Sequence, residues 1–87
     1  MSIENIKKEN IEKIVKELIA DKLSIDIKKV NLNSILKEEL GMDSFSAVEL
    51  IFELKDKFGI EIPQEDFINI KKVNDIVEYI SIRINRG

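Results

Sequence analysis

An aspartate and a serine, Asp43 and Ser44, follow a Leu-Gly-Met step and directly precede a helical pattern. The first backbone N–H groups of a helix lack partners within the helix and carry partial positive charge, so a phosphate held at that end is electrostatically favoured. Ser44 is therefore a candidate for phosphorylation or for a phosphate-linked group. The alternative is that Ser44 or Asp43 only caps the helix, and the serine alone does not decide between the two.

The composition removes most other chemistry from this serine. The chain contains no histidine and no cysteine, so it lacks the usual general base, a thiolate nucleophile, disulfides and the commonest metal ligands. A serine–lysine pair would need Lys55, which is about three helical turns away. The segment 31–39 also lacks the ligand order and central glycine of a calcium-binding loop. We therefore expect neither a hydrolase nor a metal site.

The helix after Ser44 has a wider apolar face than packing requires. At roughly 100° per residue, one stripe has the width of an ordinary core-facing side, and it consists of Ala47, Leu50, Ile51, Leu54 and Phe58. Phe45, Val48 and Phe52, which we call the apolar strip, extend the arc beyond it. The competing interpretation is that these three residues pack beneath the preceding loop, as most apolar residues of a small bundle do.

Acidic residues run beside the apolar strip. Glu49, Glu53 and Asp56, which we call the acidic border, are spaced four and three apart and fall on the adjoining side of the helix. Residues 43–63 carry five acids and two bases, so this segment supplies the whole formal net charge of −3. Exposed apolar side chains beside a polar rim are typical of docking sites. The pattern favours a partner with an apolar groove and a basic edge.

The hydrophobic periodicity predicts an all-α fold, a small four-helix bundle with three longer helices and one short helix. The first helix is expected over 3–21 with Ser2 as its cap, and its apolar stripe comprises Ile3, Ile6, Ile14, Val15, Leu18 and Ile19. The second is expected over 44–58 and should stop at Gly59. The third is expected over 64–70 with Pro63 in its first turn. The fourth should present a core stripe at Val73, Ile76, Val77, Ile80 and Ile84, with Arg83 and Arg86 near its C-terminus.

A long structured loop, residues 24–42, should connect the first two helices. Ser34, the run ILKEEL and Gly41 predict one short helical turn with its own cap and stop. Loops of this length in compact domains are usually functional or packed. We expect four apolar residues to hold the loop to the core, namely Ile27, Val30, Leu32 and Leu36.

Length and composition limit the class of protein. The 87 residues are 44% hydrophobic and 36% charged, which predicts one folded, soluble domain over 1–87. No segment approaches the ~20 apolar residues of a membrane span, and the N-terminus lacks the apolar core of a signal peptide. We therefore expect a cytoplasmic monomer without membrane insertion. The modest negative charge argues against nucleic acid as a partner.

Several spaced motifs resemble an acyl carrier protein. The matching residues are Leu40, Gly41, Met42, Asp43 and Ser44, then Val48, Glu49 and Leu50, then FGIEIP at 58–63 and VNDIVEYI at 73–80. The resemblance covers nearly the entire chain. It implies an all-helical carrier that is not an enzyme, whose Ser44 receives a 4'-phosphopantetheine arm from coenzyme A through a phosphopantetheinyl transferase. Acyl groups then travel as thioesters on the thiol of the arm, which explains how a chain without cysteine performs thiol chemistry.

The resemblance also implies partners in fatty acid synthesis or related lipid or polyketide synthesis: an acyl-loading ligase or acyltransferase, a ketosynthase and other acyl-processing enzymes. Three places depart from the usual pattern, because the chain has Phe45 where Leu is typical, Ser46 where an acid is typical, and Lys55-Asp56-Lys57 where an acidic run is typical. These departures indicate a specialised carrier. The alternatives are an aminoacyl, peptidyl or polyketide carrier and an unmodified helical interaction module. Asp43 argues against the aminoacyl and peptidyl carriers.

Overall fold

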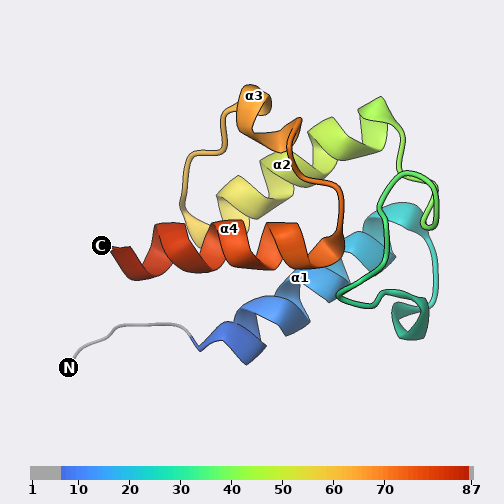
Figure 1. Cartoon of the computed structure of the whole chain (residues 1–87), viewed down its shortest axis with the longest axis horizontal. Helices are drawn as coiled ribbons and strands as arrows, with labels where there is room; N and C mark the ends of the chain where they lie inside the picture. The colour runs from blue at the N-terminus through green and yellow to red at the C-terminus, as the bar shows by residue number, and fades with distance from the viewer. Residues whose placement is uncertain (1–6, 87) are drawn as a thin grey trace.

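The computed structural model describes residues 7–86 and contains four α-helices (Figure 1). The helices are α1 (Lys8–Leu23), α2 (Ser44–Phe58), α3 (Gln64–Phe67) and α4 (Val73–Arg86), with a short 3-10 helix, η1 (Ile27–Lys29), after α1. Within the described range there is no β-strand, only an isolated antiparallel bridge between Ile35 and Lys72. The predicted all-α fold with three longer helices and one short helix is confirmed.

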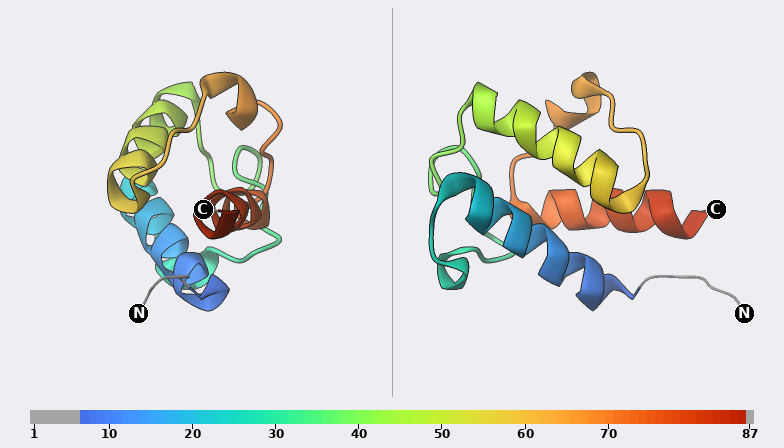
Figure 2. Two further views of the ribbon diagram at one scale, coloured as in Figure 1. Left: turned by 90° about the vertical axis from the view of Figure 1, so that its left-hand side faces the viewer. Right: turned by 180° about the vertical axis from the view of Figure 1, so that it is seen from behind.

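The three long helices share one hydrophobic core. Helix α1 packs against both α2 and α4, and α3 lies on the side of the molecule away from α1 (Figures 1 and 2). The side chains that are at most 1% exposed come from these helices: Ile11, Val15, Ile19, Leu50, Leu54, Val73, Ile76, Val77 and Ile80. The stripes predicted for the second and fourth helices are confirmed, with Ala47, Phe58 and Ile84 packed at the edge of the core.

The first helix begins later than predicted. Lys7 has an extended backbone, with φ −66° and ψ 144°, so α1 starts at Lys8. The expected cap Ser2 and the apolar residues Ile3 and Ile6 lie outside the described residues. The prediction also omitted Ile11. This side chain is fully buried, because it lies four residues before Val15 and therefore on the same face of the helix.

The C-terminus of α1 extends two residues beyond the predicted end. The helix continues to Leu23, which packs on the edge of the core, and stops at Ser24. Ser24 has a left-handed backbone, with φ 57°, and its N–H donates to the carbonyls of Ala20 and Asp21. Lys22 therefore lies within the last turn of α1 and faces the neighbouring helix.

Three of the four residues predicted to hold the long loop do so. Val30 and Leu36 are buried and Leu32 is partly buried against the core. The prediction for Ile27 is wrong, because this side chain is 41% exposed at the start of η1, which buries none of its residues. Met42, at the other end of the loop, is also buried.

The predicted helical turn before Gly41 is present as a single hydrogen-bonded turn. The Glu39 N–H donates to the Ile35 carbonyl at 2.9 Å and the Gly41 N–H donates to the Lys37 carbonyl at 3.2 Å. Gly41 has φ 75°, which explains why glycine ends the turn. Ser34 is not its cap, since the Ser34 hydroxyl accepts from the Asn31 N–H at 3.0 Å while the Glu39 carboxylate accepts from the Ile35 N–H at 2.7 Å.

The loop is hydrogen-bonded to the segment that enters α4. The Leu36 N–H donates to the Lys71 carbonyl at 2.9 Å, and the Val73 N–H donates to the Ser34 carbonyl at 3.1 Å. This pairing of residues far apart in sequence brings the end of the loop, and thus the start of α2, close to the segment that follows α3.

The third helix is shorter than predicted. It ends at Phe67, because the next N–H groups bond three residues back: Asn69 donates to Asp66 at 3.3 Å and Ile70 to Phe67 at 3.0 Å. Pro63 stands at the N-cap with an extended backbone, one position before the first turn predicted for it. Residues 68–70 therefore form a turn that leaves α3 and leads back toward α4.

Candidate functional site

Asp43 and Ser44 have different tasks at the start of α2. Asp43 is the N-cap, and its carboxylate accepts a hydrogen bond from the Ser46 N–H at 2.8 Å. Ser44 is the first residue of the helix and its side chain is exposed. The capping alternative raised by the sequence therefore applies to Asp43, and the Ser44 hydroxyl faces solvent.

The cap carboxylate is ionised at neutral pH. The Ser46 backbone N–H that donates to Asp43 stabilises the charged form and lowers the pKa of this carboxyl below its usual value. A negative charge thus already lies at the positively polarised end of α2. Any anion attached to Ser44 shares this helix end with Asp43.

A groove of about 510 Å³ opens beside Ser44. One wall comes from the loop before α2 and the other from the turn after α3, and the apolar side chains among its lining are Ile35, Leu36, Met42, Ala47, Phe67, Ile68 and Ile70. Lys37, Glu38 and Lys71 also line it. The volume and the mainly apolar walls lie in the range of small-molecule sites in proteins.

The residues after α3 were not predicted as part of the site. Phe67, the last residue of α3, and Ile68, Ile70 and Lys71 after it follow Ser44 by more than twenty positions, and they reach it because the loop pairs with the entry to α4. The sequence did carry one signal, the apolar residues Phe67, Ile68 and Ile70, but this segment was interpreted only as a short third helix.

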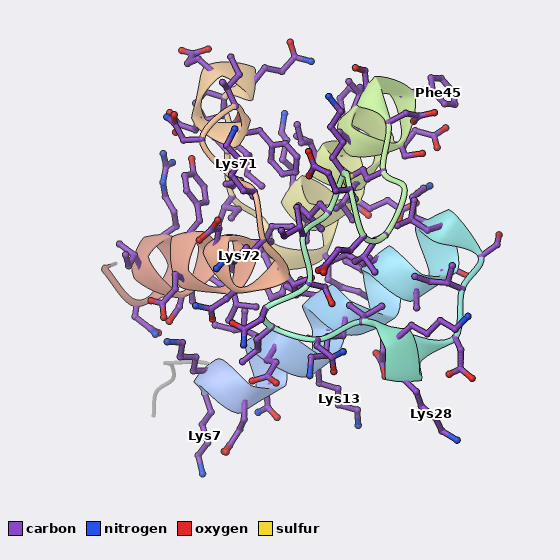
Figure 3. All side chains as sticks on the ribbon, turned by 45° about the vertical axis from the view of Figure 1, so that its right-hand side comes forward. Lys7, Lys13, Lys28, Phe45, Lys71 and Lys72 are labelled. Carbon is purple, nitrogen blue, oxygen red and sulfur yellow. The ribbon has the colours of Figure 1, made fainter. Side chains whose placement is uncertain are left out.

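Two of the three residues of the apolar strip are strongly exposed. Phe45 is 71% exposed and Phe52 is 62% exposed, whereas Val48 is half-buried. Figure 3 shows Phe45 pointing away from the body of the protein at the start of α2. The interpretation that these residues pack beneath the loop is wrong for both phenylalanines, because the loop residues turn toward the core instead.

The acidic border divides into two parts. The Lys22 ammonium from α1 lies 3.6 Å from a Glu49 carboxylate oxygen and 2.6 Å from a Glu53 carboxylate oxygen. The hydrogen bond to Glu53 raises the pKa of Lys22 above its usual value, so the ion pair persists at neutral pH. Asp56 is exposed, and no lysine or arginine lies within 4.0 Å of it among residues 7–85.

A second cation lies on the other flank of the apolar strip. The Lys55 ammonium stands 5.8 Å from the centre of the Phe52 ring and 3.5 Å from a Glu61 carboxylate oxygen. The structure therefore places one lysine on each side of the strip, Lys22 from α1 and Lys55 from α2 itself. Counting charges along the sequence did not reveal Lys22, which precedes the strip by more than twenty residues.

The described part of the chain has neither a metal-binding cluster of acids nor a helix that could span a membrane. Residues 7–86 contain no cluster of three or more aspartate or glutamate side chains arranged to hold a metal ion. Within the same range, none of the helices has the length and apolar character needed to cross a membrane.

Comparison with known proteins gives three findings. Residues 13–80 match the family model described as "Phosphopantetheine attachment site". The chain is 42% identical over 74 residues to a protein of Rickettsia bellii (strain RML369-C) named "Acyl carrier protein", an alignment that covers 85% of this chain and 86% of that protein. A solved structure from Mycobacterium tuberculosis, described as "a putative acyl carrier protein", superposes with a TM-score of 0.78 at 33% identity and covers 83% of this chain and 96% of that one.

The family match spans most of the chain, and the relatives correspond to it over nearly their whole length. Proteins of this family are carriers and not enzymes, and they work with acyl-processing enzymes. The chain therefore belongs to the acyl carrier proteins, whose phosphopantetheine-binding domain bears a covalently attached 4'-phosphopantetheine.

Proposed function

We propose that the hydroxyl of Ser44 is the attachment point of 4'-phosphopantetheine and that α2 presents the loaded arm to acyl-processing enzymes. The observation that carries this proposal is the position of Ser44, exposed at the first residue of α2 and at the edge of the groove, with the capping task already taken by Asp43. A serine with no structural task beside an apolar groove suits attachment of a group that carries an acyl chain.

The attachment step needs a separate enzyme. The Ser44 oxygen forms a bond to the pantetheine-linked phosphorus of coenzyme A, and the bond from that phosphorus to the adenosine bisphosphate part breaks. In this proposal the hydroxyl proton passes to a base that the transferase supplies. We therefore assign a phosphopantetheinyl transferase as the first partner.

The residues around Ser44 fit a phosphodiester. The first backbone N–H groups of α2 point toward this helix end, and only that of Ser46 is engaged by the Asp43 carboxylate at 2.8 Å. The groove lining carries two lysines, Lys37 and Lys71, and two acids, Glu38 and Asp43, so these side chains add no net negative charge beside a phosphodiester. When bound, the prosthetic group supplies the terminal thiol on which acyl groups are carried as thioesters.

The groove suits the apolar part of the cargo. Its walls include Met42 and Leu36, which are buried in the core at one end, and Phe67 and Ile70, which pack on the core from α3 and the turn after it. An acyl chain lying against these side chains would remove apolar surface from water, which favours binding in proportion to the buried area.

The apolar strip and the acidic border form the proposed docking surface. Phe45 and Phe52 project from α2 beside Val48, and Glu49, Glu53 and Asp56 follow on the next side of the helix. A partner with an apolar recess and positive charge complements this surface. The ligase or acyltransferase that loads the carrier, and the ketosynthase that uses its cargo, would dock here.

We assign the cargo to the acyl class. The residue Asp43 before the serine and the acyl carrier relatives both favour acyl chains over aminoacyl groups. The departures at Phe45, Ser46 and Lys55 support a specialised carrier with dedicated partners. The cytoplasmic location, the monomeric state and the extent of one domain over 1–87 stay predictions.

Intact mass spectrometry tests the attachment site. The apo-protein is incubated with coenzyme A and a broad-specificity phosphopantetheinyl transferase, and the wild type should gain the mass of one phosphopantetheinyl group. Ser44→Ala should gain none while retaining its helical circular dichroism. Ser46→Ala is the matched control, because it removes a neighbouring serine hydroxyl of the same helix and should still be modified. Modification of Ser44→Ala, or a label mapped to another residue, would overturn the proposal.

A further inference from the structure

Lys22 forms ion pairs with two of the three carboxylates of the acidic border. It belongs to α1, yet its ammonium lies 3.6 Å from Glu49 and 2.6 Å from Glu53. The Lys22 side chain is only 18% exposed, whereas those of Glu49 and Glu53 are 42% and 37% exposed. The cation is therefore held between the helices, beneath the carboxylates that it pairs with.

The docking surface is consequently less negative than its carboxylates alone suggest. Glu49, Glu53, Asp56 and Glu61 contribute four negative charges, and Lys22 and Lys55, which pair with three of these carboxylates, return two positive charges, which leaves a net of −2. The segment count of −3 for residues 43–63 overstates the local charge, because it omits a lysine contributed by another helix. Long-range steering scales with such net charge and is correspondingly reduced here.

A partner cation placed opposite Glu53 gains little. It would replace the ion pair with Lys22 by another ion pair, and it would bring a second positive charge close to Lys22. A cation opposite Asp56 meets a different situation, since residues 7–85 provide no lysine or arginine within 4.0 Å of that carboxylate. Of the three carboxylates in the acidic border, only Asp56 therefore offers a partner a new ion pair.

The apolar contribution is large by comparison. Phe45 is 71% exposed and Phe52 is 62% exposed, and aromatic side chains of this size dominate the energetics of interfaces when a recess covers them. The strip remains the main source of binding free energy once the charges beside it are largely paired.

Building on the proposed function, we propose that Lys22 tunes the docking surface so that acyl-processing partners recognise this carrier mainly through an apolar recess that receives Phe45 and Phe52, with a single cation opposite Asp56. Such partners differ from enzymes that present a broad basic ridge. Lys22 is then a specificity-determining residue that acts from outside the helix that partners touch.

A peptide titration tests the role of Lys22 directly. A short oligoarginine peptide serves as the probe of a basic ridge and is titrated into the isotope-labelled carrier while the amide signals of Glu49 and Glu53 are followed by NMR. Lys22→Gln should bind the peptide about twofold to fivefold more tightly than the wild type at low salt, and the gain should vanish at about 1 M salt.

Lys16→Gln is the matched control for this titration. Lys16 lies on the same helix and pairs with Glu12 at 2.9 Å, so its replacement changes the net charge equally and also removes one ion pair. Its affinity for the peptide at Glu49 and Glu53 should equal that of the wild type. Equal affinity of the wild type and Lys22→Gln, or an equal gain in both variants, would overturn the proposal.

Enzyme kinetics test the chemistry of the partner. With the broad-specificity transferase as the partner, kcat/KM for the wild type should change less than about threefold between about 50 and 300 mM salt. Asp56→Asn should lower kcat/KM about twofold to fivefold, and Glu53→Gln should have a smaller effect. A steep loss with salt, or a larger effect of Glu53→Gln than of Asp56→Asn, would contradict the inference.

The two proposals fail in different ways. If Ser44 is not the attachment site, Ser44→Ala gains the group or no variant gains it, while the peptide titration still gives a result because it needs no modification. If the inference about Lys22 is wrong, Ser44 is modified normally but the rate depends steeply on salt, or the peptide binds the wild type as tightly as Lys22→Gln.

Discussion

The two sides of α2 are both apolar, but one side is buried and the other is exposed. On the inner side Leu50 and Leu54 are fully buried against α1, and on the outer side Phe45 and Phe52 are more than half exposed. Both sides are apolar, so hydrophobicity alone does not tell a core residue from a residue of the proposed docking surface. The difference lies in what surrounds each side: neighbouring helices cover the first, and charged side chains border the second.

The strongest way to break this comparison is to truncate one residue on each side. Leu54→Ala should lower the free energy of unfolding by about 3 kcal/mol, because it removes a fully buried side chain and leaves a cavity. Phe52→Ala should change it by less than about 0.5 kcal/mol, as expected of exposed positions. Urea denaturation followed by circular dichroism measures both values. Similar losses for the two variants would mean that Phe52 belongs to the core.

The second test measures kcat/KM with a partner enzyme, a quantity in which the outer side of α2 should matter most. Phe52→Ala should lower kcat/KM with the phosphopantetheinyl transferase roughly tenfold, because a central aromatic anchor contributes strongly to an interface. Ile82→Ala is the control, since Ile82 is also exposed, at 56%, but lies on α4 away from the apolar strip. Ile82→Ala should leave the rate unchanged. A rate for Phe52→Ala equal to that of the wild type would remove the docking role of the outer side.

The smallest expected effect concerns the N-terminal end of α2, where Asp43 is the cap. The pKa of Asp43 is lowered in the folded state from a usual value of 3.8. Its contribution to stability is therefore present above pH 3.8 and is lost as the pH falls below that value through the folded pKa. Asp43→Asn keeps a capping oxygen without the charge, so the difference in Tm between the wild type and this variant should shrink below pH 3.8.

Thermal melting from pH 7 down to about pH 2.5 measures this difference, because that range brackets the ordinary titration of an aspartate. The Tm of the two proteins should converge as Asp43 becomes protonated. A constant difference across the range would show that the Ser46 N–H does not stabilise the charged form of Asp43.

Local patterns predicted most of the fold. The burial of Val73, Ile76, Val77 and Ile80 follows from helical spacing alone, and the stop at Gly59 follows from its left-handed backbone, with φ 66°. Ile27 and the end of α3 were predicted wrongly because short segments have weak periodicity, and their conformation depends on contacts made elsewhere in the chain.

The site could be predicted only in part. Ser44, the apolar strip and the acidic border lie within one helix, and their spacing in the sequence reports their relation in space. Lys22 and the groove residues Phe67 and Lys71 come from other elements. Their approach to α2 is set by how the helices pack and by the pairing of the loop with the entry to α4, and no local pattern encodes that geometry.

The two walls of the groove are held in place by different kinds of contact. Polar side chains hold α3, which forms one wall, against α4. The Tyr79 hydroxyl donates to Asp66 at 2.6 Å, and Arg83 reaches Asp66 at 3.1 Å and the Glu61 carbonyl at 3.1 Å. Burial, together with the Asp66 contact, raises the pKa of Tyr79 to about 12, so this link stays protonated and intact across the physiological range.

Leu36 and Met42 anchor the loop wall of the groove inside the apolar core. Phe67 and Ile70 in the other wall are only partly buried against the core, and that wall is also held by Asp66 and Arg83, whose side chains are more than a third exposed. Water can substitute for such polar ties at small net cost, but it cannot replace apolar packing. Changes in solvent or in cargo size will therefore be absorbed at the α3 wall, while the loop wall keeps the serine-bearing end of α2 in a fixed position.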